Sequence, residues 1–289
     1  MTTSAPTRVS RLRTLGIAAL VLAAIGLGGG FVLVFGWSID ETHFDRPSAE
    51  FDAFAAEIAA MPGVGAVEKE RWVEAPAFWS PVSSLRVTVE RSGLPAVLEI
   101  ACSSRNADPI DWGLVVQTPA RAQVWVFADR TESGCPDFRL DVVPTVEAVD
   151  RLAPGRSIQA AVWENGRLSF SDLLDGRAEV SSMIPFVAAA DDLRRAAGVE
   201  ADREIEISGP QLTAVPAPGE SAAYAALLRT IVDEYGVTEF WDGAGGGTPT
   251  DGVPRTQIRG DPASADAVEA AIRASGLRLA DAPVVFRED

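Results

Sequence analysis

The chain of 289 residues contains one histidine, one lysine and two cysteines, and these shortages exclude several kinds of site. A catalytic triad or a multi-histidine metal site has only His43 to draw on, and structural zinc needs more cysteine and histidine than the chain has. The single lysine, Lys69, does not lie in a G-x-x-x-x-G-K-[ST] sequence, which excludes a P-loop. We therefore predict no catalytic residue, no cofactor and no metal ion, and expect a protein that is not an enzyme.

Basic residues are also scarce relative to acidic ones. The chain has 25 Lys and Arg against 41 Asp and Glu, and its net charge is −16. Because phosphates would be repelled by such a surface, we expect no nucleic-acid partner. Arginine supplies every positive charge except that of Lys69, a bias that indicates a GC-rich bacterial genome, of the Gram-positive kind.

One long stretch lacks charge altogether, between Thr14 and Ser38. As a helix, residues 15–37 would be about 34 Å long, enough to cross a hydrocarbon core of about 30 Å. A cleaved signal peptide is the alternative, but no small-residue cleavage pattern follows the run. The sequence thus predicts a transmembrane helix over residues 14–37.

The charges beside this segment predict its orientation. The preceding residues 1–13 contain three arginines and no acid, whereas Asp40 and Glu41 follow the segment. Positive charge is retained on the cytoplasmic side of a membrane, so residues 1–13 form a cytoplasmic tail. We expect a single-pass protein of the cell membrane with its C-terminal part outside the cytoplasm.

The two cysteines, Cys102 and Cys135, fall in this extracytoplasmic part. An oxidising compartment favours a disulfide between them, and two unpaired buried thiols are the alternative. Neither cysteine is expected to be catalytic, because there is no C-x-x-C motif and no histidine nearby.

Helices and strands alternate along the rest of the chain. Apolar residues recur with a helical period in 51–58, 183–193 and 224–235. Four helices are expected to end at a glycine followed by an apolar residue, namely Gly63, Gly198, Gly236 and Gly276, and to begin at caps such as Ser48, Ser221 and Asp261. Strand patterns cover 84–90, 122–128, 157–163, 167–170 and 203–208, and Asn165-Gly166 predicts a hairpin turn.

The order of these elements predicts an α+β fold. Helix, strand, strand, helix and strand recur, and a strand before each first helix (37–43, 138–143 and 210–215) gives β-α-β-β-α-β. This is the ferredoxin-like arrangement, with two helices on one face of an antiparallel sheet. We expect two to three such units in tandem, over residues 38–130, 131–208 and 209–289. Residues 94–104 fit either a helix or a strand.

Two segments are candidates for binding. Phe78 and Trp79 lie between prolines and, if exposed, would form a rigid contact patch; the alternative is that they cover their own domain. The glycine-rich segment 242–252 carries Asp242 and Asp251, whose oxygens suit calcium, although a hairpin without an ion is the simpler interpretation.

These observations favour a non-catalytic interaction or scaffold module of the cell envelope, anchored in the membrane through residues 14–37 and recognising an envelope protein. The first alternative is a sensing domain that binds a small molecule. The second is a carboxylate-dependent hydrolase of envelope polymers, which the 41 acids allow but do not indicate.

Overall fold

The computed structural model describes residues 43–74, 79–103, 109–131, 135–173, 179–243 and 253–287. The chain divides into two compact units. Unit 1 comprises Met1–Arg46 and Arg71–Pro81, and unit 2 comprises Pro47–Glu70 and Val82–Asp289. The predicted domain boundaries at residues 130 and 208 stay a prediction.

In unit 1, a short strand pairs with the end of a longer one. Strand β1 (His43–Asp45) is antiparallel to the last residues of β2 (Val64–Glu74), with Phe44 opposite Val73. The pairing continues for one residue, since the backbone N–H of Arg46 donates to the carbonyl of Arg71 at 2.9 Å.

Unit 2 contains the first part of β2 and the remaining elements. In chain order these are α2 (Ala49–Ala59), β3 (Val82–Glu90), α3 (Leu94–Ser103), β4 (Ile110–Gln117), β5 (Gln123–Thr131), α4 (Val142–Leu152), β6 (Ser157–Val162), β7 (Leu168–Asp172), α5 (Val180–Ala188), α6 (Ala190–Ala196), β8 (Ile205–Gly209), β9 (Leu212–Ala214), α7 (Ser221–Asp233), β10 (Glu239–Gly243), β11 (Arg255–Arg259), the 3-10 helix η1 (Pro262–Ser264), α8 (Ala265–Ala274), the 3-10 helix η2 (Arg278–Asp281) and β12 (Val284–Phe286). The segment 94–104, which the sequence left open, is therefore helical in its described part.

The strands of the described residues form one mixed sheet of twelve strands in chain order. From β3 onward, successive pairs alternate between two kinds. The pairs that enclose a helix are parallel (β3–β4, β5–β6, β7–β8, β9–β10 and β11–β12). The pairs between them are antiparallel (β4–β5, β6–β7, β8–β9 and β10–β11). The hairpin predicted at Asn165-Gly166 is confirmed as the turn between β6 and β7.

This topology corrects the prediction of tandem ferredoxin-like units. A ferredoxin-like unit places another strand between the two strands that enclose a helix, which makes all neighbours antiparallel. Here those two strands are adjacent and parallel, and the sheet continues without interruption. The α+β class was predicted correctly, but the separate sheets were not, because a local pattern does not specify which strands become neighbours.

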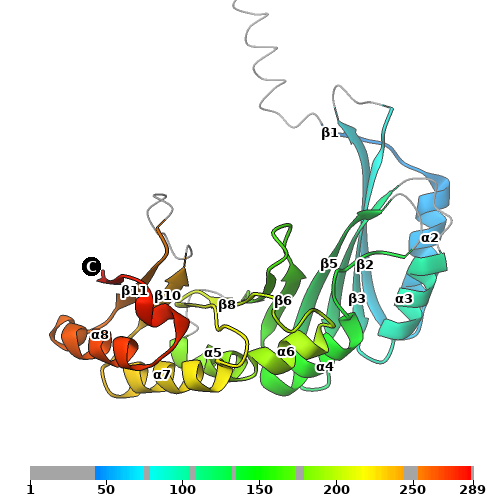
Figure 1. Cartoon of the computed structure of the whole chain (residues 1–289). Coiled ribbons are helices and arrows are strands. Elements are labelled where there is room, and N and C mark those ends of the chain that lie inside the picture. The colour runs from blue at the N-terminus through cyan, green and yellow to red at the C-terminus, as the bar shows by residue number, and fades with distance from the viewer. Residues whose placement is uncertain are drawn as a thin grey trace, which may run out of the picture. The chain divides into compact units, whose positions relative to one another are not determined.

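The helices of unit 2 pack on one face of its sheet (Figure 1). Ring contacts join α2 to β4 (Phe54 with Trp112), and Tyr224 of α7 to Phe240 of β10 at 6.2 Å. Since successive parallel pairs run in opposite directions while their helices stay on one face, the crossover connections must alternate in hand. Right-handed crossovers account for about 98% of such connections, so this alternation is an uncommon feature of the fold.

Residues on the helix-covered face form the hydrophobic core. Positions opposite one another in neighbouring strands are apolar and buried, as in the series Val87, Leu114 and Val126. The other positions of the same strands point away from the helices, because side chains alternate along a strand. We call that side of the unit 2 sheet the helix-free face; it carries Thr88, Val115, Trp125, Phe127, Gln159, Ser171, Ser208, Thr213, Trp241 and Gln257.

The expectation of a transmembrane helix also requires correction. Among the described helices none is long and apolar enough to cross a bilayer. The predicted segment, 14–37, together with the tail over 1–13, lies outside the described residues.

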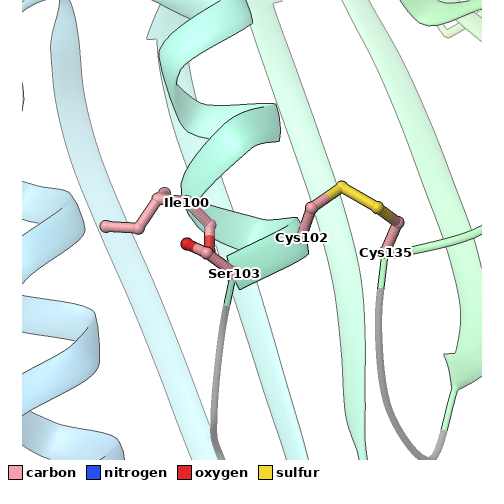
Figure 2. The surroundings of a disulfide bond; sticks show 4 residues. All are labelled: Ile100, Cys102, Ser103 and Cys135. Carbon is pink, nitrogen blue, oxygen red and sulfur yellow. A yellow bond between two sulfur atoms is a disulfide. The ribbon is translucent and has the colours of Figure 1, made fainter.

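The disulfide between Cys102 and Cys135 is confirmed (Figure 2). It joins the last turn of α3 to the segment that leads into α4, and it spans 33 positions of the sequence. Closing a loop of that size stabilises a fold by roughly 3–4 kcal/mol in the chain-entropy treatment. The bond therefore links the end of α3 to the segment that precedes α4.

Candidate interaction surface

Two aromatic side chains lie next to each other on the helix-free face. Trp125 and Phe127 are alternate residues of β5, whereas Val124 and Val126 point into the core. The two ring centroids are 6.5 Å apart and the ring planes are inclined by 33°. Phe127 is 41% exposed and Trp125 is half-buried. These two side chains form what we call the aromatic patch.

A glycine on the neighbouring strand explains why the Phe127 ring lies against the sheet. Gly113 of β4 is directly opposite Phe127. A Cβ atom at Gly113 would lie only 3.2 Å and 3.3 Å from ring atoms Cε1 and Cδ1 of Phe127. Because glycine has no side chain, the ring can approach the backbone of β4 closely.

Polar contacts fix the indole of Trp125. Its Nε1 donates a hydrogen bond of 2.9 Å to Oγ of Ser157 on β6. The guanidinium carbon of Arg86 lies 5.9 Å from the centroid of the same indole, which is a cation–π distance. Arg86 in turn donates to a carboxylate oxygen of Glu68 at 2.9 Å. The patch is therefore held in one arrangement by its neighbours.

A row of polar side chains continues from Trp125 across the sheet. Gln159, Ser171, Ser208 and Thr213 follow it at directly opposed positions of β6 to β9; the first three are half-buried and Thr213 is buried. The hydroxyl oxygens of Ser171 and Ser208 are 2.8 Å apart. At about 4.8 Å between strands, this row extends roughly 20 Å from the aromatic patch.

The charges beside this row are paired. Arg167 donates from Nε to Glu204 at 2.9 Å and from Nη1 to Glu206 at 2.8 Å. Burial lowers the pKa of the Arg167 guanidinium, but the two carboxylates outweigh burial and raise that pKa above its ordinary value. Arg259 and Glu239 form a further pair at 2.8 Å on β11 and β10. The face is thus polar without a strong net charge at these pairs.

A separate polar network lies near the helices and is structural in character. The guanidinium of Arg194 on α6 is 2% exposed and donates to the carbonyls of Arg203 and Pro216 and to the carboxylate of Asp191. Burial raises the pKa of Asp191, but hydrogen bonds from Ser221 and Gly219 and the charge of Arg194 bring it below its usual value. Each of the three guanidinium nitrogens of Arg194 therefore has an acceptor within the protein. Ser221, predicted as a helix cap, instead donates to Asp191 at 2.6 Å.

The largest shift in pKa falls on a pair of side chains, a buried phenol and a half-buried carboxylate. Tyr224 of α7 is 1% exposed and its hydroxyl donates to Oδ2 of Asp242 on β10 at 2.8 Å. Burial raises the pKa of the Tyr224 phenol well above its usual value near 10, and the charge of Asp242 adds to this. Burial also raises the pKa of Asp242, against the hydrogen bond from Tyr224. The two groups satisfy each other on the helix-covered side of the sheet.

The structure places only some of the residues predicted to bind. Trp79 belongs to unit 1 and is 79% exposed, whereas Phe78 lies outside the described residues. The contact patch that they were predicted to form therefore stays a prediction. His43 is the first residue of β1, and its expected lack of a catalytic role stays a prediction.

The glycine-rich segment 242–252 is described only at Asp242 and Gly243, and Asp251 lies outside the described residues. The carboxylate of Asp242 accepts from Tyr224, so a neighbouring phenol already engages one proposed calcium ligand. Within the described ranges, no group of three or more His, Cys, Asp or Glu could hold a metal ion. The expected absence of a metal site itself stays a prediction.

The aromatic patch was not predicted, although the sequence carried a signal for it. Residues 122–128 are mostly apolar, which is typical of a strand buried on both faces. The alternation within this run separates small aliphatic residues (Val124 and Val126) from large aromatic ones (Trp125 and Phe127). That difference in size marks two environments, and only the structure shows that one of them lacks a covering helix.

Comparison of the chain with protein-family models, with curated proteins and with solved structures finds no match.

Proposed function

We propose that this protein is a non-catalytic interaction module that acts outside the cytoplasm, in the bacterial envelope, and binds its partner through the helix-free face. The observation that carries this proposal is the aromatic patch: Phe127 is 41% exposed, yet its ring is seated on Gly113 beside a fixed Trp125. Exposed aromatic side chains that are already ordered lose little entropy on binding and contribute strongly to interfaces.

The disulfide supports the location. Disulfides persist in oxidising compartments and are rare in reducing ones, and both cysteines of this chain are used in the bond. The side chains with shifted pKa values hold the fold together, which supports a non-catalytic role. Tyr224, Asp242, Asp191 and Arg194 are all engaged with one another or with backbone groups in the fold.

Hydroxyl-radical footprinting of the full chain tests the proposed surface. The chain is oxidised once as purified protein and once in intact cells of its own bacterium. We expect oxidation of Trp125 and Phe127 to fall at least threefold in cells. Phe44, which is 40% exposed on β1 of unit 1, is the internal control and should change little.

Equal oxidation of the aromatic patch in both samples would contradict the proposed surface. Protection of Trp79 alone would instead favour the surface predicted around Phe78 and Trp79. The location is checked separately by thiol alkylation in cells, where Cys102 and Cys135 should react only after reduction. Free thiols in untreated cells would exclude an oxidising compartment.

A further inference from the structure

We infer that the ligand of the helix-free face is a neutral glycan, a chain of uncharged sugars that lies across the aromatic patch and the polar row beside it. This inference rests on the proposed function and deepens it by naming the chemical class of the partner. Three properties of the face carry it: the arrangement of the rings, the kind of polar groups, and the pairing of charges.

The two rings lie side by side and are not stacked on each other. Their centroids are separated by 6.5 Å along β5 and their planes differ by 33°. Two rings in this relation offer a shallow surface, of which Phe127 is the more open part because Arg86 lies over the indole of Trp125. A sugar ring has a face of C–H bonds, and the electron-rich face of an aromatic ring attracts such positively polarised hydrogens.

The polar groups next to the rings both donate and accept hydrogen bonds. The amide of Gln159 is opposite Trp125, and the hydroxyls of Ser171 and Ser208 follow on the next two strands. Amides and hydroxyls have the same dual capacity as the hydroxyls of a sugar. Since the strands are about 4.8 Å apart, successive side chains of the row can engage successive parts of one extended chain.

The charges on this face favour a neutral ligand over an ionic one. Arg86 is paired with Glu68, and Arg167 is paired with Glu204 and Glu206. The chain as a whole carries a net charge of −16. An acidic polymer would be repelled by the molecule, and a basic one would have to displace arginines from existing pairs. A neutral glycan would not be repelled and would not have to displace an arginine from its pair.

Affinity electrophoresis of the purified full chain tests this inference. Native gels are cast with a soluble neutral glycan (hydroxyethyl cellulose or glycol chitosan that has been fully N-acetylated) or with dextran sulfate as an anionic polymer. We expect at least one neutral glycan to retard the wild-type chain in a concentration-dependent manner, and dextran sulfate not to retard it. Phe127→Ala should weaken retardation at least tenfold, and Gln159→Ala about threefold.

The matched control is Trp79→Ala, which removes a more exposed aromatic side chain from unit 1 and should leave retardation unchanged. The circular dichroism spectrum and thermal midpoint of Phe127→Ala confirm that the variant is folded. If neither neutral glycan retards the chain, or if Trp79→Ala abolishes retardation as strongly as Phe127→Ala, the inference is wrong. Protection of Phe127 in cells without retardation by glycans would leave the proposed function intact and point to a protein partner.

Discussion

The two faces of the unit 2 sheet are built from the same strands but differ in the polarity and burial of their side chains. On the helix-covered face, most opposed positions are apolar and buried, as Phe170 and Ile207 are, and a few are polar, as Asp242 and Thr256 are. On the helix-free face, the adjacent positions Ser171 and Ser208 are half-buried hydroxyls that bond to each other. The difference teaches that a single step along each strand leads from the packed core to the face for which we propose a binding role, so that substitutions at neighbouring residues should have unlike effects.

The largest expected effect comes from removing a core ring. Phe170 is 0% exposed and its ring centroid lies 6.4 Å from that of Phe186 on α5. Phe170→Ala should lower the free energy of unfolding by about 3–5 kcal/mol, because it leaves a cavity between sheet and helix. Ser171→Ala, one residue away on the other face, should lower it by about 1 kcal/mol or less. Urea denaturation of both variants measures the difference, and similar losses would show that the two faces do not differ as described.

Sequence patterns predicted the local elements well, and the reason is that each depends on nearby residues. All four glycines expected to end helices have positive φ angles, from 67° at Gly198 to 81° at Gly63. Ser48 caps α2 by accepting from the backbone N–H of Phe51, as expected. The strand predicted over 138–143 was wrong: no strand is assigned to these residues, α4 begins at Val142, and the strand that precedes α4 is β5. Phe138, Leu140 and Val142 alternate with Arg139 and Asp141 as in a strand, but Phe138 and Val142 are buried in the core without pairing in a strand.

Long-range features could not be predicted in the same way. The alternation of Leu85, Val87 and Val89 indicates one buried face, but it does not indicate whether β2, β4 or a distant strand lies alongside. The neighbours of β3 depend on the total packing of helices against the sheet. The helix-free face depends on the same choice, because Trp125 and Phe127 become a surface only when the described helices of unit 2 take the other side.

An intermediate effect is expected from the buried pair on the helix-covered side. Tyr224→Phe should lower the free energy of unfolding by about 2 kcal/mol at pH 7, because the half-buried carboxylate of Asp242 loses its donor. Because the pKa of Tyr224 is raised in the folded state, the free energy of unfolding should fall as the pH becomes alkaline. The folded state keeps this phenol protonated, so its contribution is complete below about pH 10 and is lost as the pH rises towards the folded pKa.

Denaturation at pH 8 and at pH 10.5 measures this dependence. The wild type should lose more stability between the two values than Tyr224→Phe does. Tyr235→Phe is the matched control, since Tyr235 is the only other tyrosine and is partly exposed. The assignment would be wrong if Tyr235→Phe flattened the alkaline dependence as much as Tyr224→Phe.

The smallest effect on stability is expected on the helix-free face, where a single methyl group should disturb the patch without unfolding the protein. In Gly113→Ala the new Cβ would meet the ring of Phe127 at 3.2 Å, so the ring must move outward by a few tenths of an ångström. The reduced freedom of the unfolded chain offsets part of the strain, and the net change should be within about 0.5 kcal/mol. Oxidation of Phe127 in the purified protein should nevertheless rise, because the ring no longer rests on β4.

Gly65→Ala is the matched control, since the nearest neighbours of a Cβ atom there lie at 3.8 Å and 3.9 Å and Phe127 should be unaffected. If Gly113→Ala leaves the reactivity of Phe127 unchanged, close seating on the glycine is not what orders the aromatic patch.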